Sequence, residues 1–571
     1  MDIRKAMEDR VLFFDGAMGT MVQQAGLEGG QQPEIYNMIH PEIITSIHKA
    51  YIEAGADIIT TNTLGANKYK LEGTGYRVEE IIGQAVALAR QAAGDRWVAL
   101  DIGPIGQLME PNGSLSFDDV YEAVARQVKA GVKAGADLVI IETISDLYEM
   151  KAAVLAVKEN SSLPVFCTLT YDQSGRTMMG TDPLTAVNVL EGLGVDAIGA
   201  NCSLGPKELL PIVDEILKYA HIPVIVQPNA GLPRLEDGVT VFDVSPEEFA
   251  SYGRKMVDKG VRIIGGCCGT RPEFIEKLRE EIEDLVYNPQ LSNDRRLTAV
   301  SSASNTIIIG EDIRLVGERI NPSGKESMER ALKEEDFDGI ISEAIEQKMA
   351  GAHILDINVG LPDIDQKDIM TKLVSEIQGM VNTPLQIDST VPEVIEAAVR
   401  IYNGKPIINS VTGEEESMKA IFPIAKKYGA CVIGLTIDET GIPETAQGRL
   451  EIARRIVETA LKYGIPKENL LIDTLVLAAS ASQDMTMETL KALELIKTEL
   501  KVKTILGISN VSFGLPKRSL LNRAFLAMAL SRGLDAAILD PFDKSMMETI
   551  DSYRVMADLD EYAMDYINKY R

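Results

Sequence analysis

The sequence predicts an α/β protein made of two consecutive (β/α)8 barrels. Three observations support this: the length of 571 residues, a repeated alternation of short apolar runs with stretches of helical length, and a lapse in that alternation at residues 286–310. A chain of this length exceeds one ordinary core and suits two domains of about 250 residues. Apolar runs that alternate with helices are typical of the parallel strands of a barrel.

The first half contains eight apolar runs, each ending in a polar residue or glycine and followed by an amphipathic stretch. Two of the preceding helices end in the same Ala-Gly-Ala-Asp sequence, at residues 54–57 and 134–137. This similarity indicates either an internal repeat or a glycine that ends each helix. The predicted strands are residues 11–15, 56–62, 97–103, 136–142, 164–171, 195–202, 223–229 and 261–268.

The pattern lapses where the chain becomes polar and rich in turn-forming residues, which indicates a domain boundary. We therefore predict a first domain at residues 1–286, a linker at 287–310 and a second domain at 311–571. The second domain again has eight apolar runs. They are residues 314–321, 352–358, 384–388, 405–409, 430–438, 470–473, 503–510 and 534–540.

Composition excludes several classes of protein. With 57 basic and 85 acidic side chains the net charge is -28, which argues against a nucleic-acid or anionic-membrane surface. We find no signal peptide and no apolar run approaching a membrane span. A chain with five cysteines reads as a reduced, cytoplasmic protein. The four histidines lack metal-site spacing, and we find no nucleotide-binding loop in the expected context.

A metal site is predicted from the cysteines. Cys267 and Cys268 are adjacent and flanked by glycines, which permit the sharp turn that two neighbouring ligands need. Cys202, at the end of another predicted strand, supplies a third sulfur. Three thiolates with one open position are expected of a catalytic zinc site. Core packing and a disulfide between the adjacent cysteines are the alternatives; Cys167 and Cys431, inside apolar runs, are expected to be core residues.

Polar residues at other strand ends of the first barrel suit an amino acid. Asp15 and Gly16 begin a glycine-containing loop whose N–H groups could receive a carboxylate. Glu142, at the end of the fourth strand, could receive an ammonium group, and Asn229 lies near the same rim. The alternative is that these residues cap the helices that follow.

The strand ends of the second barrel carry carboxylates and amides, with neither cysteine nor histidine. Such a ring suits a flat heterocycle with several N–H donors and acceptors. Helix caps and a magnesium site are the competing interpretations. The residues are Glu318, Asn321, Asp356, Asn358, Asp388, Asn409, Asp473 and Asn510.

These motifs resemble known families. Residues 15–20, 199–202, 227–231 and 265–269 are similar to the zinc-dependent homocysteine S-methyltransferase domain. The motifs at residues 317–321, 356–358, 387–389, 409–410, 473 and 507–514 resemble the pterin-binding methyltransferase domain, which is related in fold to dihydropteroate synthase. In this order the two domains resemble the N-terminal half of the cobalamin-dependent methionine synthase family, a match that covers essentially the whole chain.

The resemblance implies an enzyme that moves a methyl group from 5-methyltetrahydrofolate to cob(I)alamin and from methylcobalamin to zinc-activated homocysteine. It implies that Cys202, Cys267 and Cys268 hold Zn2+, and that Asp15 and Glu142 hold the amino acid. The second barrel would bind the folate. We also hypothesise that Asn229 occupies the open zinc position before the substrate arrives.

In the second barrel the resemblance assigns Asp388, Asn409 and Asp473 to the pterin edge. It places Asn510 near N5 of the pterin, where the methyl group leaves. A tertiary amine leaves poorly unless N5 gains a proton, so we predict that Asn510 hydrogen-bonds a proton that arrives from water.

The family carries cobalamin in a later module with an Asp-x-His-x-x-Gly motif, and no histidine of this chain lies in one. We therefore expect a cobalamin-binding domain elsewhere in a longer chain or in a separate protein. Three other functions stay open. The first is a cobalamin-free homocysteine S-methyltransferase that uses a sulfonium or betaine donor, with the second barrel as a folate sensor. The second is a non-enzymatic zinc and folate scaffold, and the third is a dihydropteroate synthase-like activity. The last is disfavoured, since no clear pyrophosphate site is found.

Overall fold

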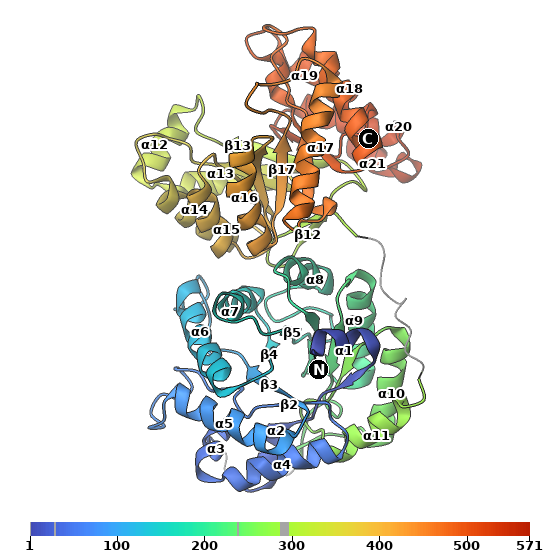
Figure 1. The fold of residues 1–571 in the computed structure, drawn as a ribbon. Coiled ribbons are helices and arrows are strands. Elements are labelled where there is room, and N and C mark those ends of the chain that lie inside the picture. The colour runs from blue at the N-terminus through green and yellow to red at the C-terminus, as the bar shows by residue number, and fades with distance from the viewer. Residues whose placement is uncertain (1, 28–29, 237–238, 286–295) are drawn as a thin grey trace. The chain divides into compact units, whose positions relative to one another are not determined.

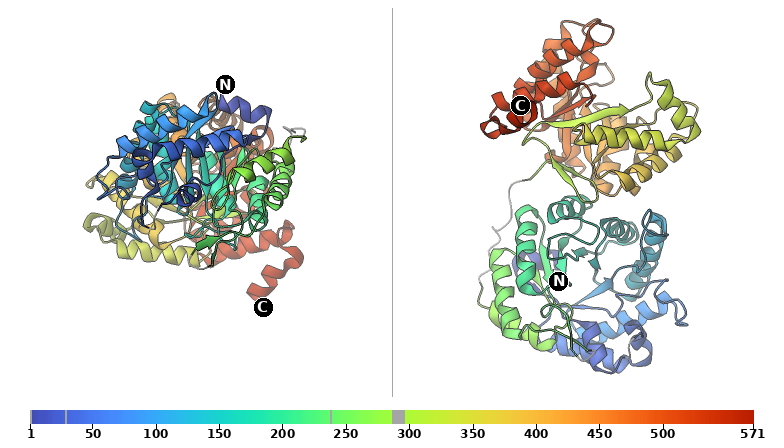
Figure 2. Two further views of the ribbon diagram at one scale, coloured as in Figure 1. Left: turned by 90° about the horizontal axis from the view of Figure 1, so that it is seen from below. Right: turned by 180° about the vertical axis from the view of Figure 1, so that it is seen from behind.

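The computed structural model describes residues 2–27, 30–236, 239–285 and 296–571 and divides into two compact units, Met1–Arg296 and Leu297–Arg571. Each unit contains eight parallel strands with helices around them (Figure 1). The same arrangement is visible from two further directions in Figure 2. The predicted α/β class and the two consecutive (β/α)8 barrels are confirmed.

The first barrel contains every strand predicted for it. The strands are hydrogen-bonded in the order β1-β10-β7-β6-β5-β4-β3-β2, and a parallel bridge between Phe14 and Ile58 joins the two ends of the sheet. The eight strands are β1 (Leu12–Phe13), β2 (Ile58–Thr60), β3 (Trp97–Ile102), β4 (Leu138–Ile144), β5 (Val165–Leu169), β6 (Ala197–Asn201), β7 (Val224–Gln227) and β10 (Ile263–Ile264). A short hairpin that the sequence did not indicate, β8 (Arg234–Glu236) and β9 (Val239–Val241), follows β7.

A helix follows each strand of this barrel and returns the chain to the start of the next strand. These helices are α4 (Pro41–Glu53), α5 (Val78–Ala93), α6 (Phe117–Ala134), α7 (Leu147–Asn160), α8 (Pro183–Gly192), α9 (Pro206–Tyr219), α10 (Pro246–Lys259) and α11 (Pro272–Ile282). Shorter helices are α1 (Ile3–Asp9), α2 (Met18–Gln24), α3 (Tyr36–Ile39) and the 3-10 turn η1 (Pro33–Ile35).

The second barrel is closed, with its strands in sequence order. They are β13 (Arg314–Ile320), β14 (Ile354–Asn358), β15 (Leu385–Asp388), β16 (Ile407–Thr412), β17 (Cys431–Leu435), β18 (Leu470–Asp473), β19 (Lys503–Gly507) and β20 (Ala536–Leu539). All eight runs predicted for this half therefore contain a strand. Because all neighbours are parallel, their carboxyl ends lie at one end of the barrel, where barrel enzymes place their sites.

Helices surround this barrel as they do the first. They are α12 (Glu326–Glu334), α13 (Phe337–Met349), α14 (Gln366–Met380), α15 (Pro392–Ile401), α16 (Glu415–Tyr428), α17 (Ala446–Lys462), α18 (Met485–Leu495), α19 (Arg518–Ser531), α20 (Lys544–Met556) and α21 (Met564–Tyr570). Short turns of other helix types are η3 (Lys467–Asn469), η4 (Ile496–Leu500), η5 (Ile508–Ser512) and η6 (Glu561–Ala563).

Helix ends follow local sequence signals. The side chains of Asp182 and Ser245 accept hydrogen bonds from backbone N–H groups in the first turns of α8 and α10, and a proline follows each of them. These caps satisfy N–H groups that have no partner inside the helix. Gly135 and Gly429 end α6 and α16 with φ angles of 94° and 71°, the left-handed conformation that glycine adopts at least cost.

The amino ends of both barrels are covered by the segment that precedes the first strand. Ile3, Ala6 and Met7 of α1 pack in one core cluster with inward-facing residues of the first barrel. In the second unit a hairpin, β11 (Ala299–Ser301) and β12 (Thr306–Ile308), has this position. Val300 packs in the interior cluster of the second barrel. The two segments therefore close the ends opposite the predicted sites.

This hairpin lies inside the segment predicted as a linker, residues 287–310. Of that segment, residues 287–295 lie outside the described residues, and residues 297–310 belong to the second unit. The polar run at residues 301–305 includes the turn of the hairpin. Ser301 bonds with its backbone to Lys405, just before β16, which ties the hairpin to the barrel.

Within the described part of the chain, no helix has the length and apolar character that crossing a membrane requires.

Candidate metal centre and ligand sites

Three cysteines meet at the carboxyl ends of two strands in the first barrel. Cys202 follows β6 directly, and Cys267 and Cys268 follow β10 after two glycines. The sulfur atoms of Cys202 and Cys268 lie 3.8 Å apart, and all three sulfurs lie within 4.8 Å of one another. The three side chains predicted as metal ligands are thus neighbours, whereas Cys167 and Cys431 are buried within strands elsewhere.

The backbone around the adjacent cysteines turns where the sequence supplies glycine. A Cβ on Gly266 would lie 2.4 Å from Oγ1 of Thr270, and Gly269 has a φ of 81°. The Thr270 hydroxyl donates to the carbonyl oxygen of Cys267 over 2.6 Å, and the Cys267 N–H donates to the carbonyl oxygen of Pro228 over 2.8 Å. These bonds fix the turn that presents both sulfurs on one side.

The donor set fits a zinc ion. Hydrogen bonds from Cys267 and Cys268 hold the pKa of the Cys202 thiol well below its ordinary value. The same contacts with Cys202 raise the pKa values of the other two thiols. Three sulfurs in reach of one ion, with Cys268 exposed to solvent, match a site with one open position.

Asn229, predicted near this rim, lies beside the sulfurs. It is only 2% exposed, and its side chain forms a hydrogen bond that lowers the pKa of Cys202. Its Oδ1 atom is buried and has no hydrogen-bond partner among the described residues. An unpaired acceptor beside three thiols is positioned to contact either an ion or a ligand.

A residue that our sequence predictions missed, Asn201, connects the cysteines to Glu142. Its Nδ2 atom lies 3.8 Å from the sulfur of Cys267, 2.9 Å from Oγ1 of Thr143 and 3.4 Å from Oε2 of Glu142. Its Oδ1 atom accepts hydrogen bonds from the Thr143 N–H and the Thr168 hydroxyl, both over 2.9 Å. Asn201 thereby fixes the positions of side chains from three strands. Its place directly before Cys202 was visible in the sequence, but it does not reveal which partners the side chain meets.

Asp15 and Glu142, the two carboxylates predicted to bind the amino acid, have different surroundings. Asp15 is 1% exposed, and both of its oxygens accept hydrogen bonds from Thr60: Oδ2 from the N–H over 2.8 Å, and both oxygens from the hydroxyl over 3.2 Å. Burial raises the pKa of Asp15. Glu142 lies closer to the cysteines, and burial together with the charge on Cys202 raises its pKa to about 7.

Gly16 lies where a side chain would not fit. A Cβ on this residue would lie 2.8 Å from Oγ1 of Thr270 and 2.9 Å from the hydroxyl oxygen of Tyr51. The next N–H in the loop, that of Ala17, donates to the Thr270 hydroxyl over 3.2 Å. The loop after β1 is therefore packed directly against the turn that carries the cysteines.

In the second barrel, three predicted residues stand level on neighbouring strands. Asn358 on β14 pairs in register with Asp388 on β15, which pairs with Asn409 on β16. The Asn358 amide nitrogen donates to Asp388 over 3.0 Å. Asp356, one inward position below, accepts a hydrogen bond from Gln386 over 2.6 Å and another from Asn409. The structure therefore brings four of the predicted residues together.

Burial raises the pKa values of the carboxyl groups in this cluster. For Asp356 the burial effect is reinforced by the charge of Asp388, whereas Asn358 partly opposes it at Asp388. Burial also raises the pKa of Glu318, on β13, whose Oε1 accepts a hydrogen bond from the Ser509 hydroxyl over 2.7 Å. A buried carboxyl group with a raised pKa can carry a proton, so it can donate to a ring nitrogen as well as accept a hydrogen bond from one.

The remaining predicted residues are less closely connected. Asp473 ends β18 and accepts a hydrogen bond from the Leu475 N–H over 2.7 Å; burial raises its pKa to about 7. Asn510 lies in η5 and is exposed, next to Ser509. Asn321 accepts a hydrogen bond from the Ser323 N–H, a local turn contact.

A fully buried arginine supports the loop after β18, and the sequence did not reveal it. Arg449 of α17 donates through Nη1 to the carbonyl oxygens of Thr474 and Leu475, over 2.6 and 3.0 Å, and to the Thr489 hydroxyl over 2.6 Å. Leu475 has a φ of 58° and supplies the N–H that holds Asp473. Arg449 therefore sets the conformation of the residues that position Asp473.

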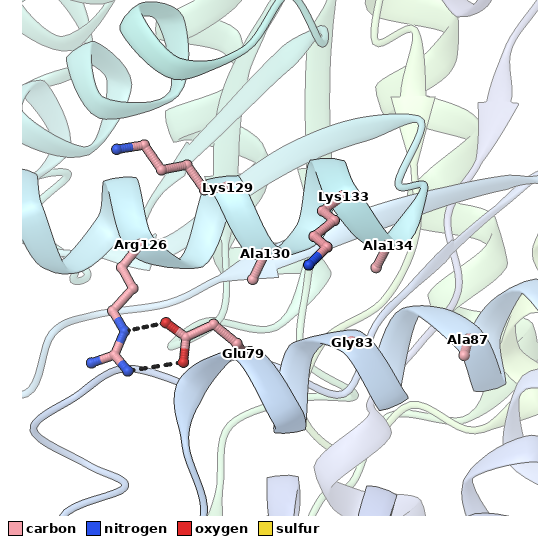
Figure 3. A pocket seen from close by; sticks show the side chains of 8 residues that line it. All are labelled: Glu79, Gly83, Ala87, Arg126, Lys129, Ala130, Lys133 and Ala134. Atoms are coloured by element: carbon pink, nitrogen blue, oxygen red, sulfur yellow. Dashed lines mark hydrogen bonds and ion pairs between the residues drawn. The ribbon is translucent and has the colours of Figure 1, made fainter.

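A hollow on the first unit lies away from the strand ends. It is lined by residues of α5 and α6, with an ion pair between Arg126 and Glu79 at 2.6 Å (Figure 3). Lys129 and Lys133 also line it. Because none of these residues follows a strand or contacts the cysteines, we assign this hollow no part in the site.

The fold and these sites together define a two-barrel α/β protein with a cluster of three cysteines in one barrel and a cluster of carboxylates and amides in the other. Residues 12–282 match the family model described as homocysteine S-methyltransferase, and residues 317–540 match that described as pterin binding enzyme. The first barrel therefore belongs to the homocysteine S-methyltransferase family and the second to the pterin-binding enzyme family.

Two curated proteins and one solved structure are similar to this chain. The chain is 32% identical to the methionine synthases of Mycobacterium tuberculosis and Mycobacterium leprae, each over 94% of this chain and 48% of the relative. It therefore spans about half the length of these curated relatives. The crystal structure of the metallated homocysteine methyltransferase MmuM from Escherichia coli is 25% identical, with a TM-score of 0.43, covering 49% of this chain and 99% of that protein.

Proposed function

We propose that this chain carries the homocysteine and folate sites of a cobalamin-dependent methionine synthase. One half-reaction moves the methyl group of 5-methyltetrahydrofolate to cob(I)alamin. The other moves the methyl group of methylcobalamin to homocysteine and forms methionine. The observation that carries this proposal is the meeting of Cys202, Cys267 and Cys268 at the strand ends of a barrel, with one sulfur open to solvent.

In the first barrel, the three cysteines would hold Zn2+, and Asn229 would contact its open side. Zinc bound there would lower the pKa of the homocysteine thiol and keep the sulfur as a nucleophilic thiolate. Asn201 would hold Cys267 in place through its 3.8 Å contact with the sulfur. The loop that contains Asp15 and Gly16 and the inward-facing Glu142 would bind the amino-acid end of the substrate.

In the second barrel, Asp356, Asn358, Asp388 and Asn409 would address the edge of the pterin ring, because their donors and acceptors stand level on neighbouring strands. Asp473 would do so from β18. These contacts orient the ring, and the raised pKa values of the carboxyl groups let them donate as well as accept. Glu318 and Asn321 would line the β13 side of the same site.

The methyl group leaves N5 only if that nitrogen gains a proton, since N5 would otherwise leave as the anion of a secondary amine, a poor leaving group. Asn510 is exposed at the strand-end face, where its amide would hydrogen-bond N5 while water delivers the proton. Ser509, beside it, is held by Glu318. The role of Asn510 is therefore to bind and orient, and no side chain of the chain is assigned as a strong acid.

The chain requires a partner for these reactions. Cobalamin would be carried by a domain or protein outside this sequence, consistent with the chain spanning 48% of its methionine synthase relatives. We assign residues 1–286 to homocysteine and zinc, residues 311–571 to the folate, and the segment between them to the connection. The expected compartment is the cytoplasm, where the five free thiols would stay reduced.

The test is to run the two half-reactions separately with free cobalamin and the purified, zinc-loaded chain. We expect both to proceed, and we expect Cys267→Ala to abolish only the transfer to homocysteine, because the folate site lies in the other barrel. Asp388→Asn is the matched control, expected to impair only the transfer from methyltetrahydrofolate. If neither half-reaction occurs while a sulfonium or betaine donor methylates homocysteine, the chain is a cobalamin-free methyltransferase.

A further inference from the structure

A layer of polar side chains lies inside the first barrel, above its apolar core. Ala99, Ile140, Phe166 and Ile225 belong to the interior core cluster. Side chains two residues apart along a strand point to the same face. The interior positions one step nearer the carboxyl ends are therefore Asp101 on β3, Glu142 on β4, Thr168 on β5 and Gln227 on β7, with Asn201 at the same end of β6.

Hydrogen bonds divide this layer into satisfied and unsatisfied groups. Thr168 bonds Asn201, which also holds Glu142, whereas Oδ1 of Asp101 and Oε1 of Gln227 are buried without a partner among the described residues. Asp101 is 6% exposed. Buried polar atoms in folded proteins are nearly always hydrogen-bonded, so an orphaned carboxylate oxygen facing a site indicates a missing donor.

The side-chain oxygens of Asp15, in contrast, already have hydrogen-bond donors. Thr60 supplies hydrogen bonds to both of its oxygens, so Asp15 is already satisfied by a residue of the neighbouring strand. A ligand ammonium group would have to compete with those bonds. At Asp101 it would meet a free acceptor.

The charges in this layer also call for a cation. Burial raises the pKa of Asp101, and the neighbouring carboxyl groups of Glu142, Asp15 and Glu34 raise it further, whereas Lys70 lowers it. These carboxyl groups repel one another in a buried setting, where an unpaired charge is costly. A ligand that brings one positive charge and several N–H donors would relieve both the repulsion and the unpaired oxygens.

We propose that Asp101, together with Glu142, receives the ammonium group of the amino-acid substrate, while Asp15 acts as a positioning residue by holding Thr60. This inference rests on the proposed function, because it takes homocysteine as the ligand of the first barrel. It adds that Asp101 makes the site select thiols that carry an α-amino group. Gln227, with its own free oxygen in the layer, supplies a further acceptor beside it.

The experiment compares two thiols that differ only in the amine, homocysteine and 4-mercaptobutyrate. Their binding to the zinc-loaded chain is measured by calorimetry, with proton release as a sign that the thiol has reached the metal. In the native protein we expect homocysteine to bind more tightly. In Asp101→Asn we expect homocysteine to weaken by at least about tenfold and 4-mercaptobutyrate by less than about twofold, because only the amine loses a charged partner.

Two further variants make the result interpretable. Asp137→Asn makes the same change at the opposite end of the neighbouring strand β4 and should leave the preference for the amine unaltered. Asp101→Ser removes the charge with a smaller side chain, in case the asparagine variant does not fold; zinc content and thermal unfolding identify that case.

Each outcome has one meaning. Loss of the amine preference in the Asp101 variants, with zinc retained, supports the inference. An unchanged ratio of the two affinities in those variants overturns it while leaving the proposed function intact. If neither thiol binds to the zinc-loaded native chain or releases a proton, the proposed function itself fails.

Discussion

The side-chain amide nitrogen of Asn201 lies 3.8 Å from the sulfur of Cys267, so a residue that is not itself a predicted ligand contacts the cysteine cluster. Asn201 also bonds Thr143, Thr168 and Glu142. The strand end that supplies Cys202 therefore also orients a sulfur supplied by another strand. Partners of this kind commonly matter nearly as much for metal binding as the ligands themselves.

We expect Asn201→Ala to weaken zinc binding by about 10- to 100-fold, because the Cys267 sulfur loses its N–H contact. A chelator competition measures the change. Thr168→Val is the control, since it removes a single bond to Asn201 and leaves the contact with the sulfur in place. Equal losses in the two variants would show that Asn201 acts only through general stability.

The cysteines provide a second prediction. Cys202→Ala should reduce the bound zinc to a trace, since two thiolates form an incomplete tetrahedral set. Cys167→Ala, a change of the same chemistry in strand β5 of the same barrel, should retain the metal because its thiol is buried away from the cluster. Metal content after gel filtration checks both. Full zinc occupancy in Cys202→Ala would remove this cysteine from the ligand set.

The third prediction concerns Arg449, whose guanidinium group donates to the carbonyl oxygens of Thr474 and Leu475. Arg449→Met fills a similar volume but removes the arginine donors, which leaves the Leu475 oxygen with only the Thr489 hydroxyl. The expected cost is about 1–3 kcal/mol for each buried group left unpaired. We expect weaker binding of the folate as well, because Leu475 holds Asp473. Fluorescence titration with a folate ligand and thermal unfolding measure the two effects.

Arg449→Lys separates charge from geometry. Lysine keeps the positive charge but lacks the planar fork that reaches several acceptors. We expect it to recover only part of the folate affinity. Complete recovery would mean that the charge near Asp473, and not the loop conformation, is what Arg449 provides.

The order of apolar runs was sufficient to predict both barrels, because a buried parallel strand leaves a run of apolar residues that ends at a polar residue or glycine. The polar run at residues 301–305 is ambiguous by composition, since hairpin turns and linkers are both rich in polar, turn-forming residues. The hairpin around it packs Val300 into the second barrel. The apolar residues on each side of the turn are too few for the sequence alone to predict the two strands of the hairpin.

Among the site residues, the cysteines could be predicted because their chemistry is specific and their glycines indicate a turn. Asn201, Asp101 and Arg449 could not, because each depends on which partner its side chain meets. Asp15 ends an apolar run and Asp101 lies near the end of another, and the hydrogen bonds from Thr60 to Asp15 distinguish them. Such differences arise from packing between strands distant in sequence.

The last prediction follows from Asp473, whose pKa burial raises to about 7 from an ordinary value of 3.8. The folded state holds this proton more tightly than the unfolded state, so its stabilising contribution is complete below about pH 4 and is lost as the pH rises through about 7. Asp473→Asn has no proton to lose. Relative to the native protein, its free energy of unfolding should therefore rise by at most about 4 kcal/mol between pH 4 and pH 8.

The chain provides an internal control for this measurement. Its single tryptophan, Trp97, lies in β3 of the first barrel, so tryptophan fluorescence reports that barrel while circular dichroism reports both. Asp473→Asn should shift only the transition seen by circular dichroism at pH 8, and folate binding should fall because one edge contact is lost. If Asp473→Asn is no more stable than the native protein at pH 8, ionisation of Asp473 in the folded protein costs little free energy. Its carboxylate would then have a partner in solution that compensates for burial.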